Sequence, residues 1–453
     1  MLSFLYSVVG FILAIAVLVT VHEFGHYWVA RRLGVKVLRF SVGFGKPIWK
    51  KVAGDDQIEY VVAAIPLGGY VKMLGEGDDE YTPEEAHRAF DNQKLWKRAA
   101  IVLAGPMINF LFAAIVYAGL NGYGFEAAKP FLGDIQKESV FYQAGLREGD
   151  ELLYVDGKKF HYFNEHQLHV FNRALNRDEM KLNISRGGQE KEIIVDFSEL
   201  TVKSYKPSFL SWEIGLRGLQ PKALPIIGTI AEGFPAADSD LNVGDKIVSI
   251  NDKPVSSWRE IVNSISSADG GLMDIEVNRD GVSKWISIRP RSTERDGRII
   301  RQVGISPEIL PVSEDMIFYY RDSFGSSLSR ALDQTWQMSV LTLRVLYKMI
   351  IGQASHKNIS GPITIASIAG EALQLSWIYY LSILAAISIS LGVMNLLPIP
   401  MLDGGHLLYY SIEALKGSPL SEKAMIIGQK IGLLLLACLM SLAFYNDIFR
   451  LFS

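Results

Sequence analysis

The sequence predicts an α-helical polytopic membrane protein with four transmembrane helices, a membrane-associated β-hairpin and a large inserted α+β region. Four apolar runs, at about residues 4–26, 99–119, 378–397 and 425–445, are each close to the roughly 20 residues that a helix needs to cross a bilayer. A polar stretch of roughly 250 residues separates the second run from the third and is too long to be a loop. Hydrophobic residues make up 49% of the 453, which fits membrane spans combined with a soluble portion.

Composition excludes several classes of function. The formal net charge is −3 and no basic tract carries interleaved aromatics, so we expect no nucleic acid as a partner. The single cysteine, Cys438, excludes disulfides within the chain and argues against thiol catalysis or cysteine-based zinc binding. The N-terminus has no basic region and no small-residue cleavage site before His22, so we expect this segment to be retained and not removed as a signal peptide.

The first apolar run ends in the stretch His22-Glu23-Phe24-Gly25-His26. Two histidines four residues apart lie on one helical face, where both rings can bind one metal ion. A glutamate between them can act as a base, the arrangement typical of HExxH zinc proteases. Because Phe4 to Val21 contains no charged residue, this helix should cross a bilayer, and ionisable groups there indicate a functional site. The pattern predicts a metalloprotease that acts inside the membrane.

Basic residues predict the topology. They are dense after the first span and before the second, at Arg31, Arg32, Lys36, Arg39, Lys46, Lys50, Lys51, Lys94, Lys97 and Arg98. The positive-inside rule makes this segment cytoplasmic, which places both termini and the middle region outside, and the first and third spans run in the same direction. Within the segment, Ile58–Met73 reads as a β-hairpin turning at Pro66–Gly69. Its edges must line a protein or water-filled cavity, because lipid does not accept them.

The middle region contains an internal repeat. Residues 144–157 match residues 239–252 at an offset of 95, and Ile184–Gly188 corresponds to Val277–Gly281. The order of turn, strand, turn, helix and hairpin resembles the PDZ module, which receives an extended peptide by strand addition. We therefore expect two inserted α+β PDZ domains that bind a peptide or a substrate ectodomain. The predicted divisions are a membrane part at 1–120, PDZ domains at 121–220 and 221–310, amphipathic surface helices at 311–375, and a second membrane part at 376–453.

A hydrolytic zinc site needs a third protein ligand beside His22 and His26. The best region is Asn395–His406, where two prolines break the inner end of the third span. Asp403 lies nearer to this break, and His406 is the alternative ligand. The spacing around Asp403 is also typical of a carboxylate that caps a turn before two glycines, so the residues alone leave the choice open.

The HExxH stretch and the run Asn395 through Gly405 match the HExxH and NxxPxPxLDG motifs of the site-2 protease family of intramembrane metalloproteases, which the sequence resembles over essentially its whole length. The resemblance implies that His22, His26 and Asp403 bind Zn²⁺ and that Glu23 is catalytic. It also implies that Asn395 and Pro398 help to bind the substrate. The stretch Ile58–Met73 would be the family's membrane-reentrant β-loop, with Gly68 and Gly69 as substrate-binding residues.

The resemblance implies regulated intramembrane proteolysis of single-pass membrane proteins. An anti-sigma factor that an earlier protease has already cut is the expected substrate, and remnants of signal peptides are a further one. The expected location is the lipid bilayer of the bacterial inner membrane, with both termini and the PDZ domains periplasmic and the active site near the cytoplasmic side. Two alternatives remain: a PDZ-based membrane adaptor with an inactive metal site, and a zinc transporter, since intramembrane histidine and aspartate also line ion paths.

Overall fold

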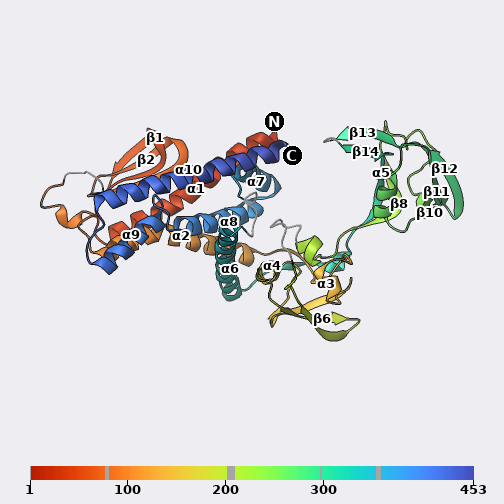
Figure 1. Ribbon diagram of the computed structural model, residues 1–453, viewed down its shortest axis with the longest axis horizontal. Helices are drawn as coiled ribbons and strands as arrows, with labels where there is room; N and C mark the ends of the chain where they lie inside the picture. The colour runs from red at the N-terminus through yellow and green to blue at the C-terminus, as the bar shows by residue number, and fades with distance from the viewer. Residues whose placement is uncertain (1, 77–80, 201–209, 296–297, 353–358, 453) are drawn as a thin grey trace.

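The computed structural model describes residues 2–76, 81–200, 210–295, 298–352 and 359–452. Within these ranges, four helices are long and apolar enough to cross a membrane, which confirms the four predicted spans: α1 (Leu2–Arg32), α2 (Leu95–Tyr123), α8 (Trp377–Asn395) and α10 (Glu422–Phe452). They form one bundle in which both termini lie at one end (Figure 1). A small β-sheet and helix α9 (Asp403–Lys416) lie at the opposite end.

A further apolar helix, α7 (Pro362–Leu375), packs against α1. The crossing uses glycines from both helices: a Cβ on Gly10 would lie 2.9 Å from the carbonyl carbon of Ala369, and one on Gly370 would lie 2.5 Å from Cα of Ser7. Small residues let two helices approach closely where no hydrophobic effect drives them together. The expectation of amphipathic surface helices throughout 311–375 is therefore wrong for this segment, which is apolar and part of the bundle.

The sheet beside the bundle consists of two long strands, β1 (Val37–Ala53) and β2 (Ile58–Met73). The predicted hairpin within Ile58–Met73 is not formed, because the two halves of that segment do not pair with each other. Phe40 of β1 instead lies opposite both Tyr60 and Val71, so β1 runs between the halves of β2. Glycines with positive φ, at Gly43, Gly45 and Gly68, allow both strands to bend where the sequence pattern indicated a single turn.

The large insertion leaves and re-enters the bundle at one place. β3 (Phe125–Ala128) follows α2 directly and pairs with β16 (Ile317–Tyr320), which precedes α6 (Phe324–Ile350). An amphipathic helix does occur in the first part of the expected range 311–375, but it begins at Phe324 because residues before it form this strand. α6 lies crosswise against α2 and α8 (Figure 1), with Ser327, Ala331 and Thr335 buried at one-turn intervals.

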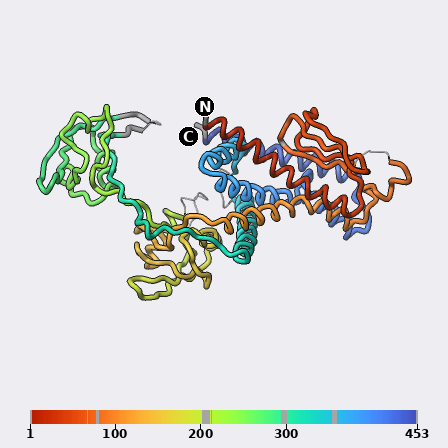
Figure 2. The backbone as a smooth tube through the Cα atoms, turned by 180° about the vertical axis from the view of Figure 1, so that it is seen from behind, coloured from red at the N-terminus to blue at the C-terminus, as the bar shows by residue number. Residues whose placement is uncertain are grey.

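The insertion contains two units that repeat one order of elements. The first has a sheet in the order β5-β4-β6-β7, and the second has the path β12-β11-β9-β8-β15 with β10 beside β9. The first unit comprises α3 (Val140–Gln143), β4 (Glu151–Val155), β5 (Lys158–Lys159), α4 (Gln167–Asn176), β6 (Met180–Arg186) and β7 (Gln189–Val195). The second comprises β8 (Lys222–Ile230), β9 (Lys246–Ile250), β10 (Lys253–Pro254), α5 (Trp258–Ser266), β11 (Met273–Arg279), β12 (Val282–Ile288), β13 (Arg291–Arg295), β14 (Arg298–Gln302) and β15 (Ile305–Leu310). Figure 2 shows both units outside the bundle.

The same ion pair closes each unit. Arg186 Nε lies 2.7 Å from Asp150 Oδ1 in the first unit, and Arg279 Nε lies 2.7 Å from Asp245 Oδ1 in the second. Both aspartates follow a glycine in the repeated Gly-Asp turn, and both arginines end the strand that pairs with the one after that turn. Each aspartate side chain is only 1% exposed, so the pair holds the turn against the sheet from inside.

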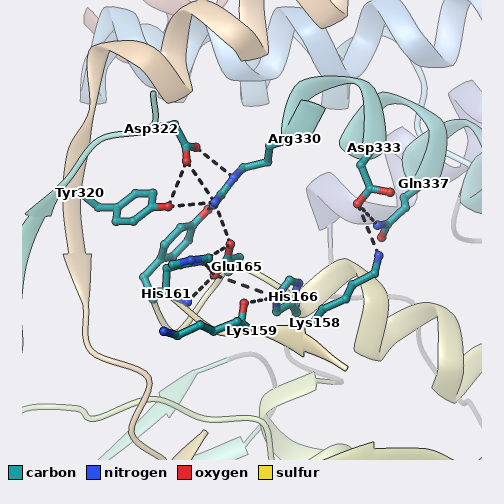
Figure 3. Close-up of polar contacts among 11 residues, drawn as sticks. Lys158, Lys159, His161, Glu165, His166, Tyr320, Asp322, Arg330, Asp333 and Gln337 are labelled. Carbon is teal, nitrogen blue, oxygen red and sulfur yellow. Dashed lines mark hydrogen bonds and ion pairs between the residues drawn. The ribbon is translucent and has the colours of Figure 1, made fainter. Parts of the chain in front are cut away.

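Several residues of α6 contact the first unit, and Arg330 makes the largest group of these contacts (Figure 3). Arg330 of α6 donates to the hydroxyl of Tyr162 at 3.0 Å and lies 2.8 Å from Oε1 of Glu165, both in the first unit. The same guanidinium lies 3.0 Å from Oδ2 of Asp322 and donates to Tyr320. Because both carboxylates are nearly buried, this arginine is a charged link between the insertion and the helix that crosses the bundle, beside the more exposed pair of Lys158 and Asp333 at 3.7 Å.

Candidate metal centre

Two histidines on α1 meet inside the bundle. His22 and His26 are one helical turn apart, and their Nε2 atoms lie 3.3 Å from each other. His26 places Nδ1 2.9 Å from the backbone oxygen of Ile101 on α2, a contact that requires a hydrogen on Nδ1. Its Nε2 is then the nitrogen with a free lone pair, which is the state in which imidazole binds a metal ion.

The loop between α8 and α9 carries Asp403 to the same place. α8 ends at Asn395, because Pro398 and Pro400 have no N–H with which to continue a helix. α9 begins at Asp403 and folds back onto this loop. Its first turn lies so close that a Cβ on Gly404 would be 2.5 Å from the carbonyl carbon of Leu396, which only glycine avoids.

The folded loop completes a group of three donors. Asp403 Oδ2 lies 3.2 Å from His22 Nε2 and 3.6 Å from His26 Nε2. One ligand atom from each residue lies within 4.8 Å of the other two, and the described part of the chain holds no other such group. Asp403 Oδ2 is buried and accepts no hydrogen bond there. Two imidazoles and a carboxylate are the donors of a catalytic zinc site with an open position, so these residues fit zinc.

The alternative third ligand lies elsewhere. His406 is not part of the three-residue group. Its ring centroid lies 6.3 Å from that of Tyr409 and 6.5 Å from that of Tyr410, within the same helix α9. The geometry therefore favours Asp403 over His406 for a shared metal ion.

The other predicted site residues surround the group at different distances. Asn395 places Nδ2 3.2 Å from His22 Nε2. Strand β2 passes beside Glu23, because a Cβ on Gly69 would lie 3.0 Å from Glu23 Cγ. Gly68 instead faces the ring of Phe44, because a Cβ on Gly68 would lie 3.0 Å from Phe44 Cζ. Pro398 is exposed in the loop after α8, and no contact places it against the three donors.

Two residues of α2 also belong to the site and were not singled out from the sequence. Asn109, which is fully buried, has Nδ2 3.1 Å from His22 Nδ1. Gly105 lies directly against both imidazoles, since a Cβ there would be 2.8 Å from His22 Cε1. The available signal was a polar amide within the apolar run 99–119, because polar groups at membrane depth are commonly functional.

Comparisons with known proteins agree with this geometry. The sequence model of peptidase family M50 matches residues 10–439. The chain is 38% identical over 455 residues to a protein of Escherichia coli K12 named regulator of sigma-E protease RseP, with both chains covered in full. It is 37% identical over 456 residues to protease RseP of Yersinia pestis and 37% identical over 455 residues to a putative zinc metalloprotease of Vibrio cholerae, again over 100% of each chain.

Proposed function

Because the chain belongs to peptidase family M50, we propose that it hydrolyses peptide bonds inside the membrane at a zinc centre held by His22, His26 and Asp403. Zinc-dependent proteolysis is the activity of the family, and the site lies among the membrane-length helices α1, α2 and α8. The observation that carries the residue assignment is the convergence of three ligand atoms, from α1 and from the start of α9, within 4.8 Å. A zinc ion bound there supplies Lewis acidity for attack on a peptide carbonyl.

Glu23 moves the proton in this proposal. Its carboxylate lies on the same helix as the two histidines, one residue after His22, and beside strand β2. A carboxylate oxygen of Glu23 takes the proton from the attacking water and then delivers it to the nitrogen of the leaving amine. The Asn395 amide, 3.2 Å from His22 Nε2, is placed to donate a hydrogen bond to the substrate oxygen on which negative charge develops.

Strand β2 offers a binding edge for the substrate backbone. A transmembrane helix satisfies its peptide groups internally, so a segment must unwind before it can be cleaved, and its freed groups need partners. Gly69 brings β2 within contact of Glu23, and strand addition there would satisfy the unwound segment next to the catalytic carboxylate. Asn395 contacts the centre directly, while Pro398 acts by ending α8 and exposing the loop.

The two repeated units are proposed to be PDZ domains at 121–220 and 221–310 that bind a peptide or the ectodomain of a substrate. Their shared order of strands and helix and their matching ion pairs support one module present twice. The insertion and both termini lie at the end of the bundle away from the basic sheet, which supports a periplasmic insertion and a cytoplasmic β1–β2 sheet in the bacterial inner membrane. By analogy with relatives named regulators of sigma-E, the proposed substrate is a single-pass anti-sigma factor after a first cut.

Metal content and cleavage measured together test the proposal. In detergent, the native chain and Glu23→Gln should both hold about one zinc ion per chain, but only the native chain should cleave a single-span model substrate. Asp403→Ala should lose zinc and activity, whereas His406→Ala, its matched control from the same helix, should keep both. Full activity in Glu23→Gln, or zinc retained by Asp403→Ala and lost by His406→Ala, would contradict the assigned roles.

A further inference from the structure

The second nitrogen of the His22 ring faces a buried amide on another helix. Asn109 Nδ2 lies 3.1 Å from His22 Nδ1, and the Asn109 side chain is fully buried. We propose that Asn109 is the positioning residue for His22: in the zinc-bound protein its amide oxygen accepts the hydrogen on His22 Nδ1 and thereby keeps Nε2 free for the metal. This inference rests on the proposed zinc centre and goes beyond its three ligands.

The two histidines need the same kind of partner, and the structure provides two different ones. His26 has the backbone oxygen of Ile101 at 2.9 Å from its Nδ1, an acceptor that no side-chain substitution removes. His22 has no such carbonyl among its hydrogen-bond contacts; the group at its Nδ1 is the Asn109 side chain. A histidine that gives Nε2 to a metal carries its hydrogen on Nδ1, so that nitrogen must face an acceptor.

The amide of Asn109 can supply this acceptor by turning over. Its Oδ1 is buried and has no hydrogen-bond partner among the described residues. A half-turn about the Cβ–Cγ bond exchanges the nearly equivalent positions of Oδ1 and Nδ2, which brings the unpaired oxygen to His22 Nδ1. With the hydrogen on His22 Nδ1, the unturned amide would set two donors against each other, so the turned amide, which places an acceptor there, is the favoured orientation.

The backbone of Asn109 is held in place from a third helix. Ser388 of α8 donates its hydroxyl hydrogen to the backbone oxygen of Asn109 at 2.9 Å, and both residues are 0% exposed. Asn109 lies one turn beyond Gly105, where α1 and α2 approach most closely at the histidines. The amide is therefore fixed between α1, α2 and α8, and its distance from His22 depends on the packing of all three helices.

Zinc affinity of purified full-length variants tests the role directly, with competition against a chelator as the readout. Asn109→Leu keeps the approximate size but offers no acceptor, and it should weaken zinc binding by about 10–100-fold, as loss of a partner behind a metal ligand typically does. Asn109→Asp offers only oxygen acceptors and should bind zinc within about threefold of the native chain, because the acceptor remains. Asn121→Leu is the matched control: Asn121 is also on α2 and 8% exposed, but it lies about 18 Å further along the helix.

Substitution of Co²⁺ for zinc gives a second readout, since its absorption spectrum reports the ligands. Asn109→Leu should alter the spectrum, while Asn109→Asp and Asn121→Leu should match the native chain. A native zinc affinity and a native spectrum in Asn109→Leu would overturn the inference, and so would a tenfold loss of zinc affinity in Asn109→Asp. The aspartate variant decides the question even if the leucine variant does not fold. Asp403→Ala, run in parallel, separates the two proposals, because zinc bound as tightly there as in the native chain would instead defeat the proposed centre.

Discussion

Gly105 sets how closely α2 approaches the two histidines, and adding one methyl group there tests the geometry of the centre. In Gly105→Ala the new Cβ would lie 2.5 Å from His26 Cε1 and 2.8 Å from His22 Cε1, whereas ordinary contact begins at 3.4 Å. His26 Nε2 would lie nearer still, so the two rings must move away by at least about 0.9 and 0.6 Å respectively, or the helices must separate. Metal–ligand distances tolerate only about 0.2 Å, so both ligands would leave their binding positions together.

The expected result is a loss of zinc affinity of at least 10–100-fold, since a change behind a single ligand already has that effect. Overpacking should also destabilise the chain by about 1–3 kcal/mol. Gly119→Ala on the same helix is the control: nothing lies within 4 Å of a Cβ at that position, and replacing a helical glycine there should be neutral or stabilising. Both variants would be measured for zinc per chain, thermal stability and cleavage of a single-span substrate. Native zinc content and activity in Gly105→Ala would refute the close contact on which this reasoning depends.

Two predictions concern the insertion. Burial by itself would raise the pKa of Asp245, but the Arg279 guanidinium and the Asn242 backbone N–H outweigh it and hold the pKa below its usual value. The pair therefore stabilises the second unit at pH values above the unfolded pKa of about 3.9, and this contribution is lost as the pH falls through the lowered pKa. Hydrogen exchange of β11 and β12 in the full chain should be faster in Arg279→Met than in the native chain at pH 7, and the difference should be smaller after incubation below about pH 4. A difference that does not depend on pH would contradict this reasoning. Arg330→Met removes the cation between the nearly buried carboxylates of Glu165 and Asp322, which keep their contacts with His161 and Tyr320. The cost should be at most about 3–5 kcal/mol, so exchange in β16 and the first half of α6 should rise. Unchanged protection there would show that the junction does not depend on the arginine.

The elements that sequence reasoning identified correctly are those governed by local pattern. Apolar runs of membrane length predicted α1, α2, α8 and α10, because hydrocarbon selects for length and apolarity. The 95-residue offset of the repeat reappears as the spacing between the starts of β4 and β9, at Glu151 and Lys246. His22, Glu23 and His26 needed only helical periodicity to be placed together.

What the sequence could not provide depends on contacts between distant segments. The pairing of β1 between the two halves of β2 follows from bends at glycines, and a local turn signal near Pro66–Gly69 gives the wrong partner. The choice between Asp403 and His406 needed the fold-back of α9 onto the preceding loop, which Gly404 permits. Asn109 looked like one polar residue in an apolar run, and its significance depends on α2 lying against His22.

Because β3 pairs with β16, the two ends of the insertion lie side by side. Nearly two hundred residues leave the bundle and return to it through this short two-stranded sheet, which sets the distance between the two ends of the insertion. Because of this pairing, the end of α2 and the start of α6 stay at a fixed separation that does not depend on how many residues lie between β3 and β16.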